Sequence, residues 1–346
     1  MGDLRIGVIG AGFWARYQIA AWQQLDGVRV TAITNRTASK AELLAKDLGI
    51  PTVCGSAEEL VGRSDVDVVD IITSEATHAE HTKLAASAGK HVVCQKPMAE
   101  HYDDCVAMAD AAEHAGVRCF VHDNWRWQAP IRGFLEWYRE RPVGRARRAR
   151  FSYLSSFPVF DMQPALRDTS RFILMDMGTH IIDTARAFVG DLHWIAAATA
   201  TVTPGIAGED VATVLAGADD DVHATIELSY ASPIEDEQEL ETRIMLECDD
   251  GVMELGPHFR AGVTTRGGTS HARYLRPVTH DWLIPRYTLS MGSCLPANRS
   301  FRDAIVSGAR SENDASDYLN TMEAVFAAYE SARRKEIVRL TTGGTR

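Results

Sequence analysis

The sequence predicts a two-domain α/β protein. Residues 1–122 are expected to form a doubly wound parallel sheet, and residues 123–346 an α/β domain with a large, mostly antiparallel open sheet. Three observations predict this architecture. The 346 residues exceed the usual size of one domain. Apolar strands alternate with helices over the first third of the chain. Later runs have the pattern of strands separated by glycine and aspartate turns.

A glycine-rich motif lies between the first two expected strands. Residues 5–9 are a short apolar run suited to a buried parallel strand, and residues 28–33 are a second one. Between them, Gly10-Ala11-Gly12-Phe13-Trp14-Ala15 has the pattern G-x-G-x-x-A and opens a helix that reaches about residue 25. This order and spacing predict a Rossmann unit that binds a dinucleotide.

Each small residue of the motif has a physical task. Gly10 makes the tight turn, Gly12 lets the backbone approach the pyrophosphate, and Ala15 keeps the helix close to the strand. The pyrophosphate would then lie on free N–H groups at the helix start. Phe13 and Trp14 share this loop and are expected to contact the cofactor.

The end of the second strand bears on the choice between NAD and NADP. An acidic residue there would accept hydrogen bonds from the ribose of NAD, but this chain has Thr34-Asn35-Arg36-Thr37. Asn35 can hydrogen-bond a ribose hydroxyl, and Arg36 can pair with a 2′-phosphate or stack on adenine. A solvated turn with Thr37 as helix cap explains the segment equally well. Both cofactors therefore stay open at this point.

The alternation continues and places polar residues at strand ends. Helices are expected over 58–61, 77–87 and 103–115, and strands over 66–72, 91–94 and 118–122. Ligands of doubly wound sheets bind outside the carboxyl ends of the strands. The residues at those ends are Thr73, Gln95-Lys96-Pro97 and His122-Asp123-Asn124.

The second domain is expected to be built on an antiparallel sheet. Its predicted strands cover 147–154, 196–202, 212–216, 224–230 and 243–248, with a last edge strand at 337–340. A capped helix is expected from about residue 313 to residue 334, and residues 258–298 are expected to be an irregular arm or pocket wall. One face of the sheet needs cover beyond its helices, which predicts a homodimer or homotetramer.

Composition and charge argue against several classes of partner. The formal net charge of −11 disfavours nucleic acid and anionic membranes, and no apolar run approaches the ~20 residues that span a bilayer. The first residues run directly into a strand, so no signal peptide is expected. The six cysteines are scattered without a Cys-x-x-Cys pair, which predicts reduced core thiols, no structural zinc and a cytoplasmic protein.

Asp176, His180 and Asp183 stand at i, i+4 and i+7 in an apolar stretch. A regular helix would place them on one stripe, where buried polar groups need partners. A polar helix face with a satisfied histidine is one interpretation, and a metal site is another. We expect no metal, because a nicotinamide dinucleotide, the predicted cofactor, accepts or donates hydride without one.

Three motifs together resemble those of the glucose-fructose oxidoreductase/inositol dehydrogenase (Gfo/Idh/MocA) family over nearly the whole chain. They are Gly89-Lys90-His91-Val92-Val93-Cys94-Gln95-Lys96-Pro97, Asn124-Trp125-Arg126-Trp127 and Asp176-Met177-Gly178-Thr179-His180-Ile181-Ile182-Asp183. The resemblance implies a Rossmann domain followed by an α/β domain whose large sheet supports the substrate and the oligomer contacts.

The resemblance also implies roles for single residues. Lys96 matches the family's catalytic lysine, and Asp176 and His180 match its partners across the substrate. Gln95 stands where the family usually has a glutamate that contacts the nicotinamide ribose, so an acceptor is kept but the charge is lost. The residues expected at the cofactor are Gly10, Gly12, Phe13, Trp14, Asn35, Arg36, Thr73, His78, Gln95, Lys96 and Asn124.

Four segments are similar to the D-apiose dehydrogenase branch of the family. They are Gly12-Phe13-Trp14-Ala15-Arg16-Tyr17, Gln95-Lys96-Pro97-Met98-Ala99, Asn124-Trp125-Arg126-Trp127-Gln128-Ala129-Pro130 and Ser156-Phe157-Pro158-Val159-Phe160-Asp161. That likeness favours NAD and implies oxidation of an aldose at its anomeric carbon to a lactone. Aromatic rings can cover the C–H face of a sugar while polar groups bind its hydroxyls. Candidates beside Lys96, Asp176 and His180 are Arg126, Trp127, Phe160 and Gln163, although about half of such residues could simply pack the domain interface.

The expected reaction removes a proton from a hydroxyl while hydride passes to nicotinamide C4. A lysine beside a cationic nicotinamide can act as base because the positive charge favours the neutral amine, and His180 is the competing base. Polyol or inositol oxidation is the neighbouring alternative. A non-catalytic nucleotide sensor and an eliminative or hydrolytic enzyme with tightly held NAD belong to other classes.

Overall fold

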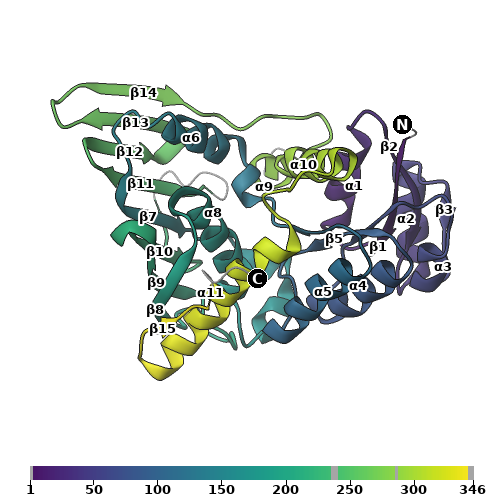
Figure 1. Ribbon diagram of the computed structural model, residues 1–346. Coiled ribbons are helices and arrows are strands. Elements are labelled where there is room, and N and C mark those ends of the chain that lie inside the picture. The colour runs from purple at the N-terminus through teal and green to yellow at the C-terminus, as the bar shows by residue number, and fades with distance from the viewer. Residues whose placement is uncertain (1–2, 235–240, 285–286, 342–346) are drawn as a thin grey trace. The chain divides into compact units, whose positions relative to one another are not determined.

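The computed structural model describes residues 3–234, 241–284 and 287–341, which form two compact units (Figure 1). The first unit consists of the chain up to Asn124, a short stretch that begins at Thr279, and Met291–Leu319. The second consists of Trp125–Val278, a short stretch that ends at Ser290, and the chain from Asn320 onward. Both units are therefore assembled from segments that lie far apart in the sequence.

The first unit contains a parallel six-stranded sheet. Its strands are β1 (Leu4–Ile9), β2 (Val28–Thr34), β3 (Thr52–Val53), β4 (Val68–Ile71), β5 (His91–Gln95) and β6 (Cys119–His122). Their order is β3-β2-β1-β4-β5-β6, so the chain changes direction across the sheet between β1 and β4. This order confirms the predicted doubly wound sheet, and it places the ligand-binding edge beyond the carboxyl ends of these two strands.

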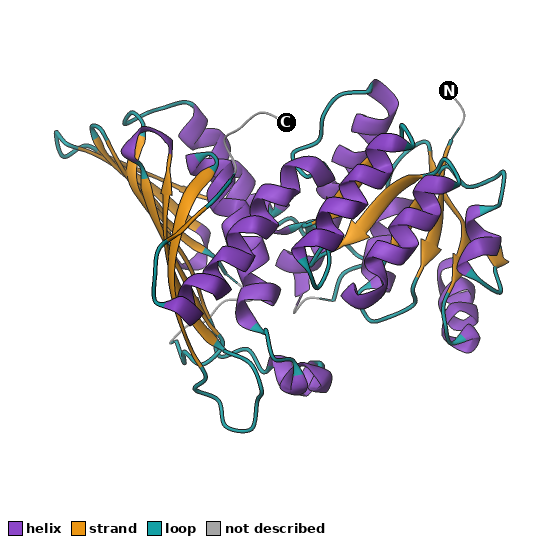
Figure 2. Cartoon of the chain, turned by 60° about the horizontal axis from the view of Figure 1, so that its bottom comes forward, coloured by secondary structure: helices purple, strands orange, loops and turns teal. Residues whose placement is uncertain are grey.

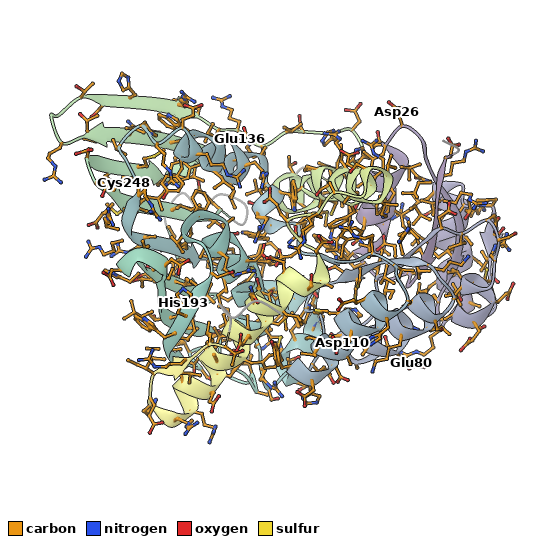
Figure 3. The ribbon with its side chains drawn as sticks, in the orientation of Figure 1. Asp26, Glu80, Asp110, Glu136, His193 and Cys248 are labelled. Atoms are coloured by element: carbon orange, nitrogen blue, oxygen red, sulfur yellow. The ribbon has the colours of Figure 1, made fainter. Side chains whose placement is uncertain are left out.

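Helices cover both faces of this sheet. They are α1 (Ala15–Gln23), α2 (Ala38–Leu48), α3 (Ala57–Val61), α4 (His78–Ser87), α5 (Tyr102–His114) and α10 (Cys294–Ser307). Helix α1 packs against α10, and α4 packs against α5 on the other side of the strands (Figure 1). Glu80 on α4 and Asp110 on α5 point outward (Figure 3), in line with the net negative charge.

Helix α10 completes the first unit, although it follows the large sheet in the sequence. Phe301 of α10 stacks on Phe120 of β6, with ring centroids 5.1 Å apart. Asp314 forms a β-bridge with Phe120 and accepts a hydrogen bond from Arg118 Nη2 at 2.9 Å. The expected boundary after residue 122 grouped this helix with the second domain, because aromatic packing between distant segments leaves no local sequence signal.

The second unit is built on a nine-stranded sheet, as expected mostly antiparallel (Figure 2). Its strands run in the order β14-β13-β12-β11-β7-β10-β9-β8-β15. Among the described strands of this sheet, β7 and β10 are the one parallel pair. The strands are β7 (Ala146–Leu154), β8 (Leu192–Ala200), β9 (Val211–Ala218), β10 (His223–Ser229), β11 (Arg243–Cys248), β12 (Gly251–Leu255), β13 (Arg260–Thr265), β14 (Ser270–Tyr274) and β15 (Val338–Arg339).

One face of this sheet is covered by helices. Helix α8 (Thr179–Val189) packs on β7 and β10, and α6 (Ala129–Arg139) packs on β12. Along β7, Phe151 is buried whereas Arg148 and Arg150 are exposed, so the two faces of the sheet differ. Leu215 of β9 is 39% exposed on the second face. The other helices are α7 (Val159–Met162), α9 (Thr288–Gly292) and α11 (Ala315–Arg334).

The prediction that residues 258–298 are irregular is wrong for much of that stretch. Strands β13 and β14 pair as an antiparallel hairpin beside β12, and helices α9 and α10 follow. All five residues of β14 are exposed. Because an exposed edge strand buries no apolar face, its sequence lacks the alternation by which strands are recognised.

Candidate active site

The glycine loop of the first unit has the backbone that a dinucleotide needs. Gly10 has φ +121°, and a Cβ built there would lie 2.2 Å from the carbonyl oxygen of Ile72 at the end of β4. A Cβ at Gly12 would meet nothing within 4 Å. Helix α1 begins at Ala15, and the side chain of its N-cap residue Trp14 makes no capping hydrogen bond. An uncapped helix start beside a bare backbone fits a bound pyrophosphate.

Of the residues expected around the cofactor at this end of the sheet, Asn35 holds the glycine loop in shape. Asn35 Oδ1 accepts from the Ala11 N–H at 3.1 Å, and its Nδ2 donates to the Thr37 carbonyl at 3.0 Å. Arg36 beside it is exposed. Phe13 is 52% exposed and meets Tyr17 edge-on, with ring centroids 5.5 Å apart. Asn35 therefore has a local role, tying β2 to the glycine loop.

Two alanine substitutions in the loop are expected to separate fold from cofactor binding. Gly10→Ala places a Cβ against the Ile72 carbonyl at a positive φ, so it should lower the free energy of unfolding by about 1–3 kcal/mol and abolish NADH binding. Gly12→Ala fills open space and should weaken NADH binding while leaving the melting temperature unchanged. Thermal unfolding and NADH fluorescence titration measure the two effects. NADH binding by Gly12→Ala at wild-type affinity would contradict the close approach of the backbone.

His78 links the ends of two strands. Its Nδ1 lies 3.0 Å from the Pro97 carbonyl oxygen, and its Nε2 lies 3.3 Å from that of Thr73. Burial lowers the pKa of His78, although both carbonyl groups favour its charged form. Thr73 also accepts a hydrogen bond from Thr77 Oγ1 at 2.8 Å. Both ring nitrogens of His78 thus face backbone, and the imidazole fixes the segment that follows Lys96.

Lys96 follows Gln95, the last residue of β5, and is half-buried. The Lys96 backbone N–H donates to Gln95 Oε1 at 2.7 Å, and Gln95 Nε2 donates to Gln18 Oε1 at 2.8 Å. Asn124, another expected cofactor contact, is buried, and its Nδ2 donates to Ser293 Oγ at 2.8 Å. Gln95 therefore connects Lys96 to helix α1.

In the second unit, the stripe predicted for Asp176, His180 and Asp183 is not a regular α-helix. Leu174–Gly178 forms a turn of π-helix, and α8 starts directly after it at Thr179. Because a π turn takes more residues than an α turn, it rotates Asp176 relative to the two later residues. Single π turns are frequent at functional sites. The three side chains accordingly have different partners.

Asp176 pairs with a tyrosine. Tyr230 Oη donates to Asp176 Oδ2 at 3.0 Å. Burial and the neighbouring carboxylate raise the pKa of Tyr230 well above its ordinary value, so its hydroxyl keeps the proton that it donates. The ring of Tyr230 stacks on Phe172 at 5.5 Å and meets Tyr153 edge-on at 5.5 Å. Asp176 is thus an oriented acceptor beside an aromatic cluster.

His180 is held by a tryptophan. Its ring stacks on Trp125, with centroids 4.7 Å apart and planes 24° from parallel. Trp125 is anchored by its Nε1, which donates to Thr242 Oγ1 at 2.8 Å. Both residues are buried. The π–π contact fixes the plane of the imidazole, which a base or hydrogen-bond partner of the substrate requires.

Asp183 and Arg126 form a buried ion pair with each other. Arg126 Nε and Nη2 donate to the two carboxylate oxygens of Asp183 at 2.5 and 2.7 Å, and Nη2 also donates to its carbonyl at 2.8 Å. Thr321 Oγ1 donates to Asp183 Oδ1 at 3.3 Å. A buried, bidentate arginine is a poor candidate for a sugar ligand, because each bond that it gave to substrate would unpair a buried carboxylate.

The remaining expected substrate residues lie in the second unit and are covered to different degrees. Phe160 is buried, with Arg167 over its ring at 5.0 Å, whereas Gln163 is exposed. Trp127 is half-buried under Arg132, whose guanidinium carbon lies 4.4 Å from the ring centroid. Both rings therefore carry an arginine on one face.

The sequence patterns assign no functional role to two residues that hold the candidate site together. They predict Tyr230 only as the last residue of a strand, and Trp125 only as part of the motif Asn124-Trp125-Arg126-Trp127. The one signal for Tyr230 was a tyrosine at the end of the predicted strand 224–230, which is not by itself a functional pattern. No local pattern could reveal that Trp125 meets His180, because the two are far apart in the sequence.

In the part of the chain that the structure describes, no group of three or more His, Cys, Asp and Glu residues could hold a metal ion. None of the described helices is long and apolar enough to cross a membrane.

Comparison with known families gives two matches that together span most of the chain. Residues 4–123 match the family described as "Oxidoreductase family, NAD-binding Rossmann fold". Residues 131–254 match the "GFO/IDH/MocA C-terminal domain".

Individual relatives agree with these matches. D-apiose dehydrogenase from Paraburkholderia graminis is 33% identical over 96% of this chain and 88% of the relative. D-apiose dehydrogenase from Rhizobium rhizogenes is 33% identical over 96% of both chains. A crystal structure of an oxidoreductase from Agrobacterium radiobacter in complex with NAD+, L-tartaric acid and magnesium is 33% identical, has a TM-score of 0.95, and covers 97% of this chain and 98% of that one.

Proposed function

Because the chain belongs to the GFO/IDH/MocA oxidoreductase family, with its NAD-binding Rossmann fold, we propose that it is an NAD-dependent dehydrogenase of an aldose. D-apiose is the best candidate substrate. The observation that carries this choice is the 33% identity to two D-apiose dehydrogenases over 96% of the chain. The family and the NAD-binding fold were predicted from the sequence, and these matches confirm them.

Oxidation at the anomeric carbon turns the C1–OH of a cyclic sugar into a lactone carbonyl. The C1 hydrogen leaves as hydride and the O1 hydrogen leaves as a proton. Bound NAD supplies the hydride acceptor, nicotinamide C4. Lys96 and His180 are the candidate bases for the proton. Asp176, oriented by the Tyr230 hydroxyl, is the candidate acceptor for a second sugar hydroxyl or for the imidazole N–H of His180.

Cofactor binding is assigned to the first unit. The bare backbone at Gly10 and Gly12 and the uncapped start of α1 fit the pyrophosphate. Gln95 and Thr73 lie at or just beyond the carboxyl ends of β5 and β4, where a nicotinamide ribose is expected. Phe13, Trp14, Asn35, Arg36, His78 and Asn124 complete the proposed cofactor set.

Sugar recognition is assigned to the second unit. Tyr230 and Trp125 hold Asp176 and His180, respectively, in the orientation that would meet the sugar. Trp127, Phe160 and Gln163 are further candidates. Arg126 is assigned instead to supporting α8, because its guanidinium is bound to Asp183.

A screen of pentoses, hexoses and polyols against NAD and NADP, read as reduced cofactor, tests the proposal. We expect D-apiose to give the highest kcat/KM with NAD, together with a lactone that hydrolyses to the acid. A polyol or inositol as best substrate would correct the substrate class. Binding of NADH without turnover of any sugar would favour a nucleotide sensor, and turnover without net NADH would favour eliminative or hydrolytic chemistry.

A further inference from the structure

A buried carboxylate lies inside the first unit, two side chains away from Lys96. Asp70 stands on β4 and has no exposed surface. Gln18 Nε2 donates to Asp70 Oδ1 at 2.6 Å, and Trp22 Nε1 donates to Asp70 Oδ2 at 2.7 Å. Both donors come from α1. The described side chains thus place two donors, and no cation, on the oxygens of Asp70.

The contacts of Asp70 continue to Lys96 as a directed chain. Gln18 gives its NH₂ to Asp70 and accepts at Oε1 from Gln95 Nε2, at 2.8 Å. Gln95 in turn accepts at Oε1 from the Lys96 backbone N–H, at 2.7 Å. We call this chain of hydrogen bonds, from the Lys96 N–H through Gln95 and Gln18 to Asp70, the relay. In each of its bonds the donor lies on the Lys96 side and the acceptor on the Asp70 side. The direction is fixed at both ends while Asp70 is ionised, because a carboxylate only accepts and a backbone N–H only donates.

Keeping Asp70 ionised costs stability. Burial raises its pKa to about 7, against the two hydrogen bonds that lower it. The folded protein therefore holds the Asp70 proton more tightly than the unfolded chain, and stability is lost as the pH rises toward 7. The titratable groups packed near Asp70 are the thiols of Cys94 on β5 and Cys294 on α10, and burial raises the pKa of each, so neither supplies a charge. The buried Asp70 carboxylate therefore lowers stability, and no cation among the described side chains offsets that cost. Its presence needs a reason other than stability.

We propose that Asp70 is a positioning residue for Lys96, acting through Gln18 and Gln95. The inference rests on the proposed function, in which Lys96 meets the substrate. The carboxylate sets the direction of both amides, and so supplies the Lys96 N–H with its acceptor. In the family, a glutamate at position 95 would place a negative charge next to Lys96. In this chain the corresponding charge is on Asp70, and the side chains of Gln18 and Gln95 lie between it and Lys96.

Asp70→Asn is expected to reverse the relay. The Trp22 indole can only donate, so the new amide must turn its oxygen to Trp22 and its NH₂ to Gln18. Gln18 and then Gln95 must reverse to accept, which leaves the Gln95 NH₂ facing the Lys96 N–H. Two donors then oppose each other at Lys96. Misplacement of a reacting group on this scale lowers kcat by about 10- to 100-fold.

Gln95→Glu creates the opposite conflict. The new carboxylate accepts from Lys96 N–H and also from Gln18, which must therefore turn its Oε1 toward Asp70. Two acceptors then oppose each other unless Asp70 takes a proton. In the double variant Asp70→Asn/Gln95→Glu, every donor again finds an acceptor, in reversed order. Each single variant should lose turnover, and the double variant should recover to within about fivefold of wild type, a coupling that independent sites do not show.

The cycle is measured by kcat on the sugar that wild type oxidises, and by nuclear magnetic resonance of the cofactor-free protein. Gln95-Lys96 is the one Gln-Lys pair in the sequence, and the sequence has no Glu-Lys pair. Labelling with ¹⁵N-lysine and ¹³C-carbonyl glutamine, or ¹³C-carbonyl glutamate in the proteins that carry Gln95→Glu, therefore gives a single signal for the Lys96 amide. We expect that signal to move in both single variants and to return in the double variant. If wild type oxidises no sugar, the proposed function fails while the resonance cycle still tests the relay.

Asp67→Asn is the matched control, since the Asp67 carboxylate, just before β4, accepts from Arg5 Nη2 at 2.6 Å. It should lower stability and leave kcat unchanged. Asp70→Asn should instead keep or raise the melting temperature at pH 8 while losing activity. Additive losses in the double variant, or an unmoved Lys96 signal in Asp70→Asn, would overturn the proposal. If Asp70→Asn does not fold, the pH dependence of Gln95→Glu tests the proposal. Protonation of Asp70 removes the conflict between the two acceptors, so the loss of kcat relative to wild type must become smaller as the pH falls below 7. A loss of kcat that stays constant with pH would contradict the relay.

Discussion

Replacing Lys96 by methionine is expected to lower kcat by about 10³- to 10⁴-fold, the effect of losing a general base, while NADH still binds. Methionine keeps the length and apolar stem of the side chain and removes only the amine. Initial rates under saturating NAD and sugar measure the loss, and fluorescence titration measures NADH affinity. Partial recovery with added primary amines would show that the missing group is the amine itself.

Lys90→Met is the matched control for Lys96→Met. Lys90 lies in the same unit, and its Nζ donates to the carbonyl oxygens of Arg63 and Val66, both at 2.9 Å. Its loss leaves two carbonyls short of a partner, so the melting temperature should fall while kcat stays within about twofold of wild type. Near-wild-type turnover in Lys96→Met would remove Lys96 from the reaction, whatever Lys90→Met does.

Replacing His180 by phenylalanine is expected to lower kcat by about 10²- to 10³-fold without unfolding the protein. A phenyl ring can keep the stacking on Trp125 and loses both ring nitrogens. Rates measured across pH add a second readout, because the acid limb of the profile should vanish in the variant that lacks the main base. Comparing Lys96→Met with His180→Phe therefore assigns that base.

His193→Phe controls for the loss of an imidazole elsewhere in the second unit. His193, labelled in Figure 3, is paired with Asp219, its Nε2 lying 2.6 Å from Asp219 Oδ1, and the two side chains are 36% and 71% exposed. It should retain wild-type turnover. A His180→Phe variant that unfolds would be replaced by His180→Tyr, which keeps a ring of similar shape. Wild-type kcat in a folded His180 variant would leave Lys96 as the only candidate base.

Local patterns predicted most of the fold. Strands β1, β4, β5 and β6 are buried on both faces and stand out as apolar runs, and the glycine motif fixed the order of the first elements. Strand β14 was not predicted from the sequence, because all five of its residues are exposed and its sequence does not alternate between polar and apolar residues. The place of α10 in the first unit depends on the stacking of Phe301 on Phe120, which no window of sequence contains.

The sequence identified which residues belong to the candidate site, but not how their side chains are arranged. Lys96, Asp176 and His180 were named from motifs, but the π turn at Leu174–Gly178 was not, because its extra residue leaves no compositional mark. Asp70 had a visible signal, a carboxylate in the middle of the apolar run of residues 66–72. Its partners on α1 could be found only in three dimensions.

The late return of α10 to the first unit has a consequence for how the protein is made. When residues up to Asn124 have left the ribosome, β6 still lacks Phe301 against Phe120, His122 lacks Asn298, and the carbonyl of Gln18 lacks the amide of Asn298. The nascent nucleotide-binding half therefore waits, partly uncovered, while the whole large sheet is synthesised. A premature stop anywhere before α10 leaves an open apolar surface rather than half an enzyme, so translation must run almost to the end before either half can be finished.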